Sequence, residues 1–175
     1  MPYYKVRLMN FIIEKAKAAD AVEILEYLKR VGGETDNLTF DAEGMPFTAQ
    51  QEAEYISSIE ASKDNVMLVA KCEGQIVGLV SLSRLPRRMS HRGDLAISVI
   101  KSHWNKGVGS ELMKNIIDFG KKNAFEIIEL QVRCDNDAAI HLYEKFGFER
   151  IATHSDFFKI GNKYIDFEIM RLKLK

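Results

Sequence analysis

Residues 104–110 combine residue types that suit the binding of an anion. They read Trp-Asn-Lys-Gly-Val-Gly-Ser and follow the apolar stretch 95–100. Gly107 and Gly109 keep Cβ atoms away from the backbone N–H groups, and a helix that begins here adds partial positive charge at its N-terminus. The pattern therefore predicts a phosphate or pyrophosphate site, although a plain strand-to-helix turn uses glycine in the same way.

Two other phosphate-binding patterns are absent from this chain. A Walker A loop requires the sequence GxxxxGK[ST], which does not occur. A Rossmann fingerprint requires a third glycine after GxG, and Leu112 stands at that position. A general nucleotide-binding domain, which ATP or NAD would stabilise, is therefore disfavoured.

A second segment, residues 136–148, carries polar groups on a predicted helix. Asn136 suits the N-cap of that helix, and its amide could equally serve a ligand. The Tyr143 phenol can donate a proton, and Gly147 allows the helix to end before the next strand. As a bare pattern, Tyr143 and Leu142 also fit a helix face that packs against the core.

Together, the two segments resemble the GNAT superfamily of N-acetyltransferases. In that superfamily a strand leads into a [Q/R]xxGx[G/A] turn, and an Asn…Ala…Leu-Tyr-x-Lys-x-Gly-Phe segment follows one helix and one strand later. Gly107 and Gly109 match the small positions of the turn, with Trp104 at the Gln/Arg position. The second motif is matched by Asn136, Ala139, Leu142, Tyr143, Lys145, Gly147 and Phe148. The resemblance is specific over residues 95–148 and extends in element order over residues 10–172.

This resemblance implies an acetyl-CoA-dependent N-acetyltransferase that acts on a primary amine of a small molecule or of a peptide or protein N-terminus. The pantetheine arm would run beside the backbone of Ile97, Ser98 and Val99, as an added strand does. Asn136 and Tyr143 would lie near the thiol end. The pyrophosphate would be held by the backbone N–H groups of Asn105, Lys106, Gly107, Val108, Gly109 and Ser110.

The resemblance also implies that the amine attacks the acetyl carbonyl directly, in a ternary complex. Tyr143 would protonate the departing thiolate, and the N–H of Val99 would stabilise the oxyanion. A base must first deprotonate the amine, since an alkylamine with a pKa near ~10.4 is mostly protonated at pH 7. Asp94, one residue from the usual place of that base, is the first candidate. Glu129, Glu34 and ordered water are the alternatives.

In this superfamily the acceptor site lies between the region that joins the first two helices and the last strands, here about 32–48 and 154–164. The first region holds four carboxylates that could attract a cationic amine, such as a polyamine or a peptide N-terminus, or could belong to a polar loop. These carboxylates belong to Glu34, Asp36, Asp41 and Glu43. Five aromatic residues could line an apolar pocket or pack the core: Phe40, Phe47, Phe157, Phe158 and Tyr164.

Hydrophobic periodicity predicts the elements that must position these groups. A helix is expected from a cap at Asp20 to a stop at Gly32-Gly33, and Glu73-Gly74 marks a hairpin turn. The other predicted helices cover 49–61, 107–123 and 138–145, and the predicted strands cover 10–15, 66–72, 75–82, 95–100, 126–132, 148–158 and 163–172. This order predicts one α/β domain over residues 1–175, with a core over about 10–172. Its mixed, mostly antiparallel sheet would be flanked by about four helices.

Composition and charge argue against several other classes of protein. Basic and acidic residues number 25 each, whereas a general nucleic-acid binder normally has a basic excess. The longest apolar run, from Val66 to Ala70, is too short for a membrane helix, and Glu14 interrupts the apolar residues near the N-terminus. We therefore expect a cytoplasmic protein with neither a nucleic acid nor a membrane as partner.

The remaining reactive side chains have structural interpretations. Cys72 and Cys134 are predicted to be structural, and the four histidines show no metal-ligand spacing, so no metal site is expected. A local basic cluster is interpreted as a solvated hairpin tip rather than an anion site. It consists of Arg84, Arg87, Arg88, His91 and Arg92.

One alternative of a different class stays open beside the enzyme. The same fold can serve as a non-catalytic acyl-CoA sensor or partner-binding module, because a fold does not by itself imply an activity. Tyr143 favours catalysis, whereas Trp104 and the lack of an obvious base keep this alternative open. Pairing of the last strands into a homodimer is likewise undecided by the sequence.

Overall fold

A seven-stranded sheet forms the centre of the computed structural model, which describes residues 10–175; the first nine residues of the predicted domain lie outside that range. The strands lie in the order β1-β2-β3-β4-β5-β7-β6, and β4 and β5 run parallel while all other neighbours are antiparallel. The predicted mixed sheet is therefore confirmed. Its strands are β1 (Phe11–Lys15), β2 (Asn65–Cys72), β3 (Gln75–Arg84), β4 (Arg92–Val99), β5 (Ile127–Arg133), β6 (Glu149–Ile160) and β7 (Lys163–Lys173).

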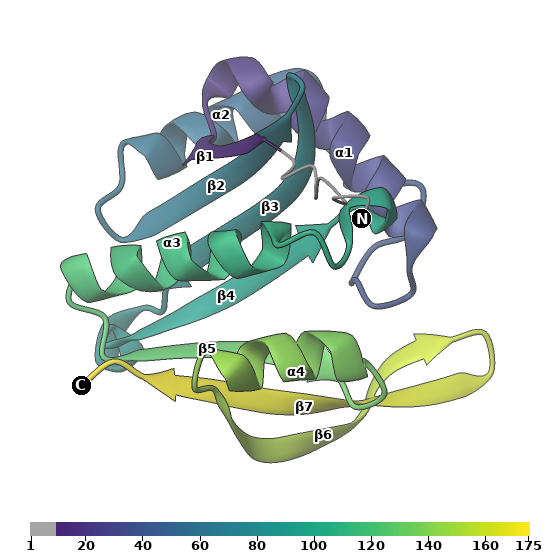
Figure 1. Ribbon diagram of the computed structural model, residues 1–175, viewed down its shortest axis with the longest axis vertical. Coiled ribbons are helices and arrows are strands. Elements are labelled where there is room, and N and C mark those ends of the chain that lie inside the picture. The colour runs from purple at the N-terminus through teal and green to yellow at the C-terminus, as the bar shows by residue number, and fades with distance from the viewer. Residues whose placement is uncertain (1–9) are drawn as a thin grey trace, which may run out of the picture.

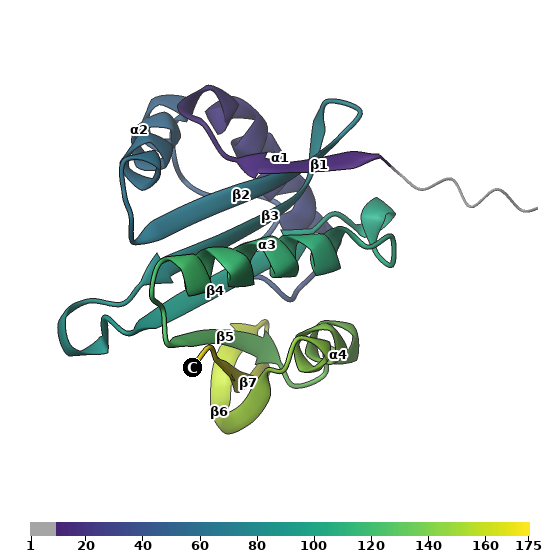
Figure 2. The ribbon, with the colours of Figure 1, turned by 60° about the vertical axis from the view of Figure 1, so that its left-hand side comes forward.

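Four helices cover the two faces of this sheet (Figures 1 and 2). They are α1 (Ala21–Glu34) and α2 (Ala49–Glu60) on one face, and α3 (Val108–Lys122) and α4 (Asp137–Lys145) on the other. The most deeply buried side chains lie between α3 and the sheet, where Leu112, Met113 and Ile116 have no exposed surface. Their spacing of three and four residues is the helical periodicity that the sequence shows.

Local signals account for several element boundaries. Glu73 and Gly74 both have positive φ angles, 52° and 81°, and they join β2 and β3 as the predicted hairpin turn. Thr48 caps α2 by accepting a hydrogen bond from the Gln51 N–H at 3.2 Å. Asp20 stands at the N-cap position of α1, but its carboxylate instead accepts from the Lys17 N–H and the Lys71 ammonium group, each at 2.8 Å.

The prediction that Gly32-Gly33 ends α1 is wrong, because the helix continues to Glu34. A Cβ atom on Gly32 would lie 2.1 Å from the carbonyl oxygen of Asp41, where the following loop folds back onto the helix. Glycine is thus required here for a close approach of two backbones rather than for a helix end. The chain leaves the helix at Thr35, which is extended.

Replacing Gly32 by alanine is expected to lower the free energy of unfolding by about 2 kcal/mol, because the Asp41 backbone must move to admit the methyl group. Urea denaturation of the variant measures this change. Gly33→Ala is the matched control, since its Cβ would meet only Ala42, with the Cβ at 3.3 Å and the Cα at 3.8 Å. The free energy of unfolding of the control should rise by up to ~1 kcal/mol, because alanine favours the helix more than glycine does. Equal stabilities of the two variants would contradict the backbone-contact explanation.

β4 and β5 pair over only three residues and then separate. Arg92, Gly93 and Asp94 lie opposite residues 127–129 of β5, whereas the pairing of β4 with β3 continues to Val99. Figure 1 shows the two strands in contact at one end and diverging toward the other. The edge of β4 that faces β5 is therefore unpaired over residues 95–99, and this opening positions the site described next.

Candidate functional site

The backbone of β4 presents hydrogen-bonding groups to the opening between β4 and β5. The Ile100 N–H donates to the Val77 carbonyl at 3.0 Å, and this residue pair continues the antiparallel register of β3 and β4. Because bonded pairs alternate in such a ladder, the N–H and C=O of Ile97 and Val99 point away from β3, while those of Ser98 point toward it. Of the three predicted residues, Ile97 and Val99 thus have backbone groups suited to binding an extended ligand.

The turn that leads into α3 holds six consecutive backbone N–H groups, from Asn105 to Ser110, that donate no hydrogen bond within residues 10–175. Asn105 and Gly107 have φ angles of 58° and 85°, and this left-handed backbone curves the turn. A Cβ atom on Gly107 would meet no atom within 4 Å, so the space beside the turn is open. Free N–H groups at a helix N-terminus form the donor set that suits a phosphate or pyrophosphate.

Trp104 joins this turn to the end of β4. Its indole N–H donates to the carbonyl oxygen of Val99 at 2.7 Å, and 42% of the residue is exposed. The side chain at the usual Gln/Arg position is therefore engaged within the protein. The backbone N–H groups that follow it donate no hydrogen bond within residues 10–175, so they stay free although the Trp104 side chain is engaged.

Tyr143 lies at the bottom of the opening, in a cavity of about 500 Å³ that Val99, Gly107 and Asn136 also line. Only 7% of the residue is exposed, and its ring packs at 5.9 Å from the ring of Phe148. Its hydroxyl forms no hydrogen bond with residues 10–175, and burial raises the pKa of the phenol well above its usual value of 10.0. The hydroxyl therefore keeps its proton at neutral pH.

Asn136 acts first as a helix cap. Its side-chain oxygen accepts from the Ala139 N–H at 3.3 Å, at the N-terminus of α4. The cap function predicted from the sequence is thus confirmed. The residue also lines the cavity, so its position suits a ligand contact as well.

Among the three carboxylates considered as a base, Asp94 alone lines the cavity. The surrounding protein withdraws water from its carboxylate and, together with the negative charge of Glu129, raises its pKa. Glu129 itself pairs with Arg92. Glu34 accepts from the Lys101 N–H at 2.6 Å and pairs with Arg30 at 3.2 Å. The arrangement therefore favours Asp94 over the other two.

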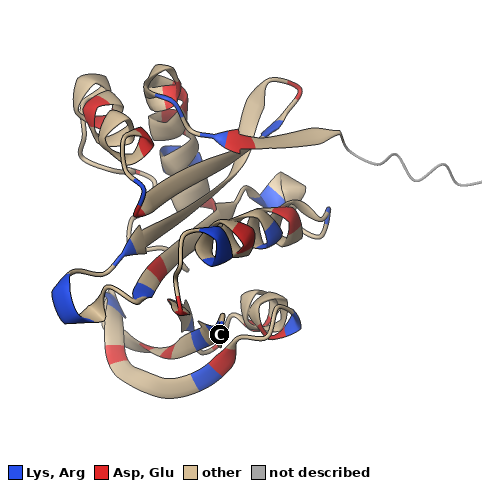
Figure 3. Ribbon diagram, turned by 90° about the vertical axis from the view of Figure 1, so that its left-hand side faces the viewer, with Lys and Arg blue, Asp and Glu red and all other residues tan. Residues whose placement is uncertain are grey.

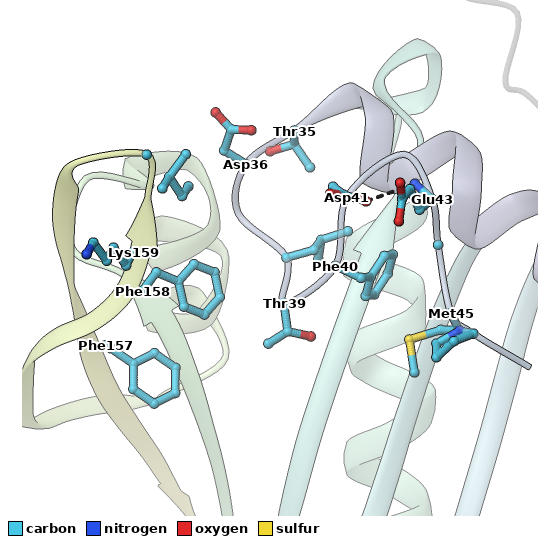
Figure 4. A pocket seen from close by; sticks show the side chains of 15 residues that line it. Thr35, Asp36, Thr39, Phe40, Asp41, Glu43, Met45, Phe157, Phe158 and Lys159 are labelled. Carbon is cyan, nitrogen blue, oxygen red and sulfur yellow. Dashed lines mark hydrogen bonds between the residues drawn. The ribbon is translucent and has the colours of Figure 1, made fainter.

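A second cavity, of about 970 Å³, adjoins the first and shares residues with it, including Thr39 and Phe158. It lies between the loop after α1 and the tip of the β6–β7 hairpin, the two regions that the sequence assigns to the acceptor (Figure 4). Phe40, Phe157 and Phe158 line it. Phe47 and Tyr164 do not line it, and they are 45% and 56% exposed.

Sequence reasoning did not identify Arg133, which fastens the loop after α1 to the end of β5. Its guanidinium binds both carboxylate oxygens of Asp135, at 2.8 and 2.7 Å, and also donates to the carbonyl of Asp36 at 3.2 Å. In the sequence, the opposite charges of Arg133 and Asp135, two residues apart at a strand end, could have indicated that these two side chains pair. The contact with Asp36, 97 residues away, carries no such signal.

The basic cluster divides into residues with different partners. Arg84 pairs with Asp64 and stacks over the ring of Phe125, and Arg92 pairs with Glu129. Arg87 and Arg88 form an exposed turn at the start of β4, whereas the turn into α3 follows its end (Figure 3). The interpretation as a solvated hairpin tip therefore fits this pair of residues.

The remaining groups give no sign of another reactive centre. Cys134 lies beside Glu168, and burial together with nearby carboxylates raises the pKa of its thiol. Within residues 10–175, no three potential metal ligands come together. In the same part of the chain, no helix is long and apolar enough to cross a membrane.

Comparisons with known proteins agree with this geometry. The sequence model of the acetyltransferase (GNAT) family matches residues 35–148. The N-alpha-acetyltransferase RimI of Mycobacterium tuberculosis is 31% identical over 102 residues, which are 58% of this chain and 63% of that protein. The L-amino acid N-acetyltransferase AaaT of Escherichia coli is 36% identical over 102 residues, 57% of this chain and 62% of that protein. The match thus spans a little under two thirds of these curated relatives.

Solved structures share the whole fold. An acetyltransferase of the GNAT family from Streptococcus pneumoniae has a TM-score of 0.91 and 30% identity, covering 95% of this chain and 100% of that chain. An acetyltransferase from Salmonella typhimurium, solved with its cofactor acetyl-CoA, has a TM-score of 0.83 and 20% identity, covering 94% of each chain. At that identity the second structure supports the fold alone.

Proposed function

The chain belongs to the acetyltransferase (GNAT) family, and from this premise we propose that it is an N-acetyltransferase that transfers the acetyl group of acetyl-CoA to a primary amine. One observation carries the proposal: four of the residues with free N–H groups after Trp104, namely Asn105, Gly107, Gly109 and Ser110, and the unpaired edge of β4 line the same cavity as Tyr143. The first two features suit an elongated diphosphate ligand, and the hydroxyl is a proton donor at its far end.

The chain's own residues would hold this cofactor in two ways. The N–H groups of Asn105 to Ser110 would donate to its pyrophosphate, and the backbone N–H and C=O of Ile97 would pair with its pantetheine arm, since the Val99 carbonyl already accepts from Trp104. When bound, acetyl-CoA supplies the acetyl group and the thiolate leaving group. The free donors on the turn and the open space beside Gly107 fit such a ligand.

Three groups would manage charge and protons during transfer by direct attack of the amine. Asp94, as a carboxylate, takes a proton from the acceptor ammonium ion. The Val99 N–H, which points into the opening, donates to the carbonyl oxygen on which negative charge develops. Tyr143 holds a proton at its hydroxyl and gives it to the departing sulfur. Each role needs only the group's position at the cavity and its protonation state.

Thermal unfolding with and without acetyl-CoA tests the proposed function, with ATP and NAD as controls. At about 100 times its Kd the cofactor should add ~2.7 kcal/mol to the stability, which raises Tm clearly. The same protein is then assayed for thiol release with a panel of amines. Binding without turnover would mean a non-catalytic acyl-CoA binder, and no stabilisation by acetyl-CoA would overturn the proposal.

Replacing Asp94 by asparagine is expected to lower kcat/KM by about 10- to 100-fold, because the base is lost. In the unmodified protein, kcat/KM rises with pH as Asp94 loses its proton. Partial desolvation of this carboxylate, together with the charge of Glu129, raises its pKa and moves the rise to a higher pH than for an ordinary aspartate. The variant should lack that rise. The measurement is a pH profile with one amine throughout.

Glu129→Gln is the matched control for this profile. It keeps the Asp94 carboxylate but removes the negative charge beside it, so the pKa of Asp94 falls and the rise in kcat/KM moves to lower pH. An unchanged profile in Asp94→Asn would assign the base role to another group or to water.

A further inference from the structure

Apolar side chains, among polar ones, form the wall of the larger cavity on both sides. From the loop after α1 it receives Leu38, Phe40 and Met45, and from the β6–β7 hairpin it receives Phe157 and Phe158. In Figure 4, the rings of Phe157 and Phe158 lie on the side of the cavity that faces Phe40 and Thr39. An acceptor held between these side chains therefore meets aromatic and hydrocarbon surface on both sides.

The aromatic side of this wall is held in place by its own packing. The ring of Phe158 lies 4.3 Å from that of Phe167, and the ring of Phe157 lies 4.8 Å from it. Phe167 is 3% exposed and belongs to β7. The rings at the hairpin tip are thus fixed against a buried strand residue, and they present a preformed surface to an apolar ligand.

The negative charges at this cavity are available to a cationic ligand. Within residues 10–175, the carboxylates of Asp36 and Glu43 accept no hydrogen bond and form no ion pair, although both residues line the cavity. Asp94 lines the adjoining cavity, as Tyr143 also does. An ammonium ion is therefore attracted to the opening before Asp94 deprotonates it.

Positively charged side chains, in contrast, are fewer at the two cavities than carboxylates. Among the described residues that line the two cavities, Arg133 and Lys159 are the lysine and arginine side chains. Arg133 binds Asp135 through two hydrogen bonds. Lys159 lies 5.3 Å from the ring of Tyr164, and Figure 4 shows its ammonium end turned away from the facing loop. A carboxylate on the acceptor would thus meet fewer cationic partners than the carboxylates that an ammonium ion meets here, which are those of Asp36, Asp41, Glu43 and Asp94.

We propose that the acceptor is an apolar primary amine with no carboxylate beside its amino group, such as an arylalkylamine, whose body lies against Phe40, Phe157 and Phe158. This inference rests on the proposed function. In the reaction, the amine nitrogen bonds to the acetyl carbon as the carbon–sulfur bond of acetyl-CoA breaks. The acceptor ammonium ion first loses one proton to Asp94, which later releases it to water. The departing sulfur takes the proton of Tyr143, the second proton lost by the amine nitrogen restores the Tyr143 hydroxyl, and the products are an amide, CoA thiol and one free proton.

The test compares acceptors that differ in the carboxylate alone. We expect kcat/KM for 2-phenylethylamine to exceed that for L-phenylalanine by about 20-fold or more, with L-phenylalaninamide close to the amine. Equal or higher activity with L-phenylalanine would overturn the inference. Activity with spermidine but with none of the phenyl compounds would overturn it too, while leaving the proposed function intact. Failure of acetyl-CoA to stabilise the protein would instead remove the proposed function itself.

A pair of variants tests where the acceptor lies. Phe158→Ala should raise the KM for 2-phenylethylamine about tenfold, because its ring lines the larger cavity. Tyr164→Ala is the matched control, since this aromatic residue belongs to the same hairpin but is 56% exposed and lines neither cavity. Equal effects of the two variants on the amine KM would overturn the placement.

Discussion

Replacing Tyr143 by phenylalanine is expected to lower kcat by about 100- to 1000-fold while the KM for acetyl-CoA stays within about threefold. The substitution removes one oxygen and keeps the ring, which packs against Phe148. The hydroxyl forms no hydrogen bond with residues 10–175, so its loss leaves no partner unsatisfied. Steady-state kinetics with saturating amine measure the effect, and Tm should remain nearly constant.

Tyr27→Phe provides the matched control for this prediction. Tyr27 is also a buried tyrosine, 4% exposed, but its hydroxyl is hydrogen-bonded to the Ser98 hydroxyl at 2.9 Å. The control should therefore lose about 1 kcal/mol of stability and keep most of its kcat. An unchanged kcat in Tyr143→Phe would assign the proton-donor role to another group. A similar fall in kcat for both variants would indicate a packing effect instead.

Replacing Ser110 by aspartate is expected to affect the empty protein and the acetyl-CoA complex in opposite directions. Ser110 lies in the first turn of α3 and lines the cavity. A carboxylate at a helix N-terminus stabilises the helix by ~0.3–1 kcal/mol, so Tm without cofactor should rise slightly. The same charge repels a bound diphosphate, and we expect the Kd for acetyl-CoA to increase roughly 100-fold.

Ser110→Asn distinguishes charge from size in that experiment. Asparagine has nearly the same shape as aspartate but no charge, so its Kd should stay within about threefold of the unmodified protein. Calorimetric titration with acetyl-CoA measures both variants, and raising the salt concentration should reduce the difference between them. Equal Kd values for the two variants would mean that the pyrophosphate does not bind at this turn.

Features set by a few neighbouring residues could be predicted from the sequence. The Glu73-Gly74 hairpin, the helix that follows Gly107 and the cap at Asn136 all depend on turn geometry, periodicity or capping within a short segment. The prediction that Gly107 and Tyr143 belong to one site came from a family resemblance that covers both motifs, and the two residues do line one cavity. That combination was needed because neither motif alone specifies a reaction.

Features created by contacts between distant segments could not be predicted in the same way. Gly32 reads as a helix stop in the sequence, but its role is set by the Asp41 carbonyl of a loop that folds back. Glu34 reads as an available carboxylate, yet Lys101 and Arg30 occupy it. In both cases the local residue types fit two interpretations, and tertiary packing decides between them.

The short pairing of β4 with β5 also affects how the molecule holds together. Three residue pairs form the ladder between a half-sheet of four strands and a half-sheet of three. A ligand that bonds to Ile97 and Val99 on one side of the opening and contacts α4 on the other would link the two half-sheets. The two halves of the empty protein should then melt with weaker cooperativity than those of the complex. The concentration of the ligand would thus determine how cooperatively the protein unfolds as well as how fast it turns over.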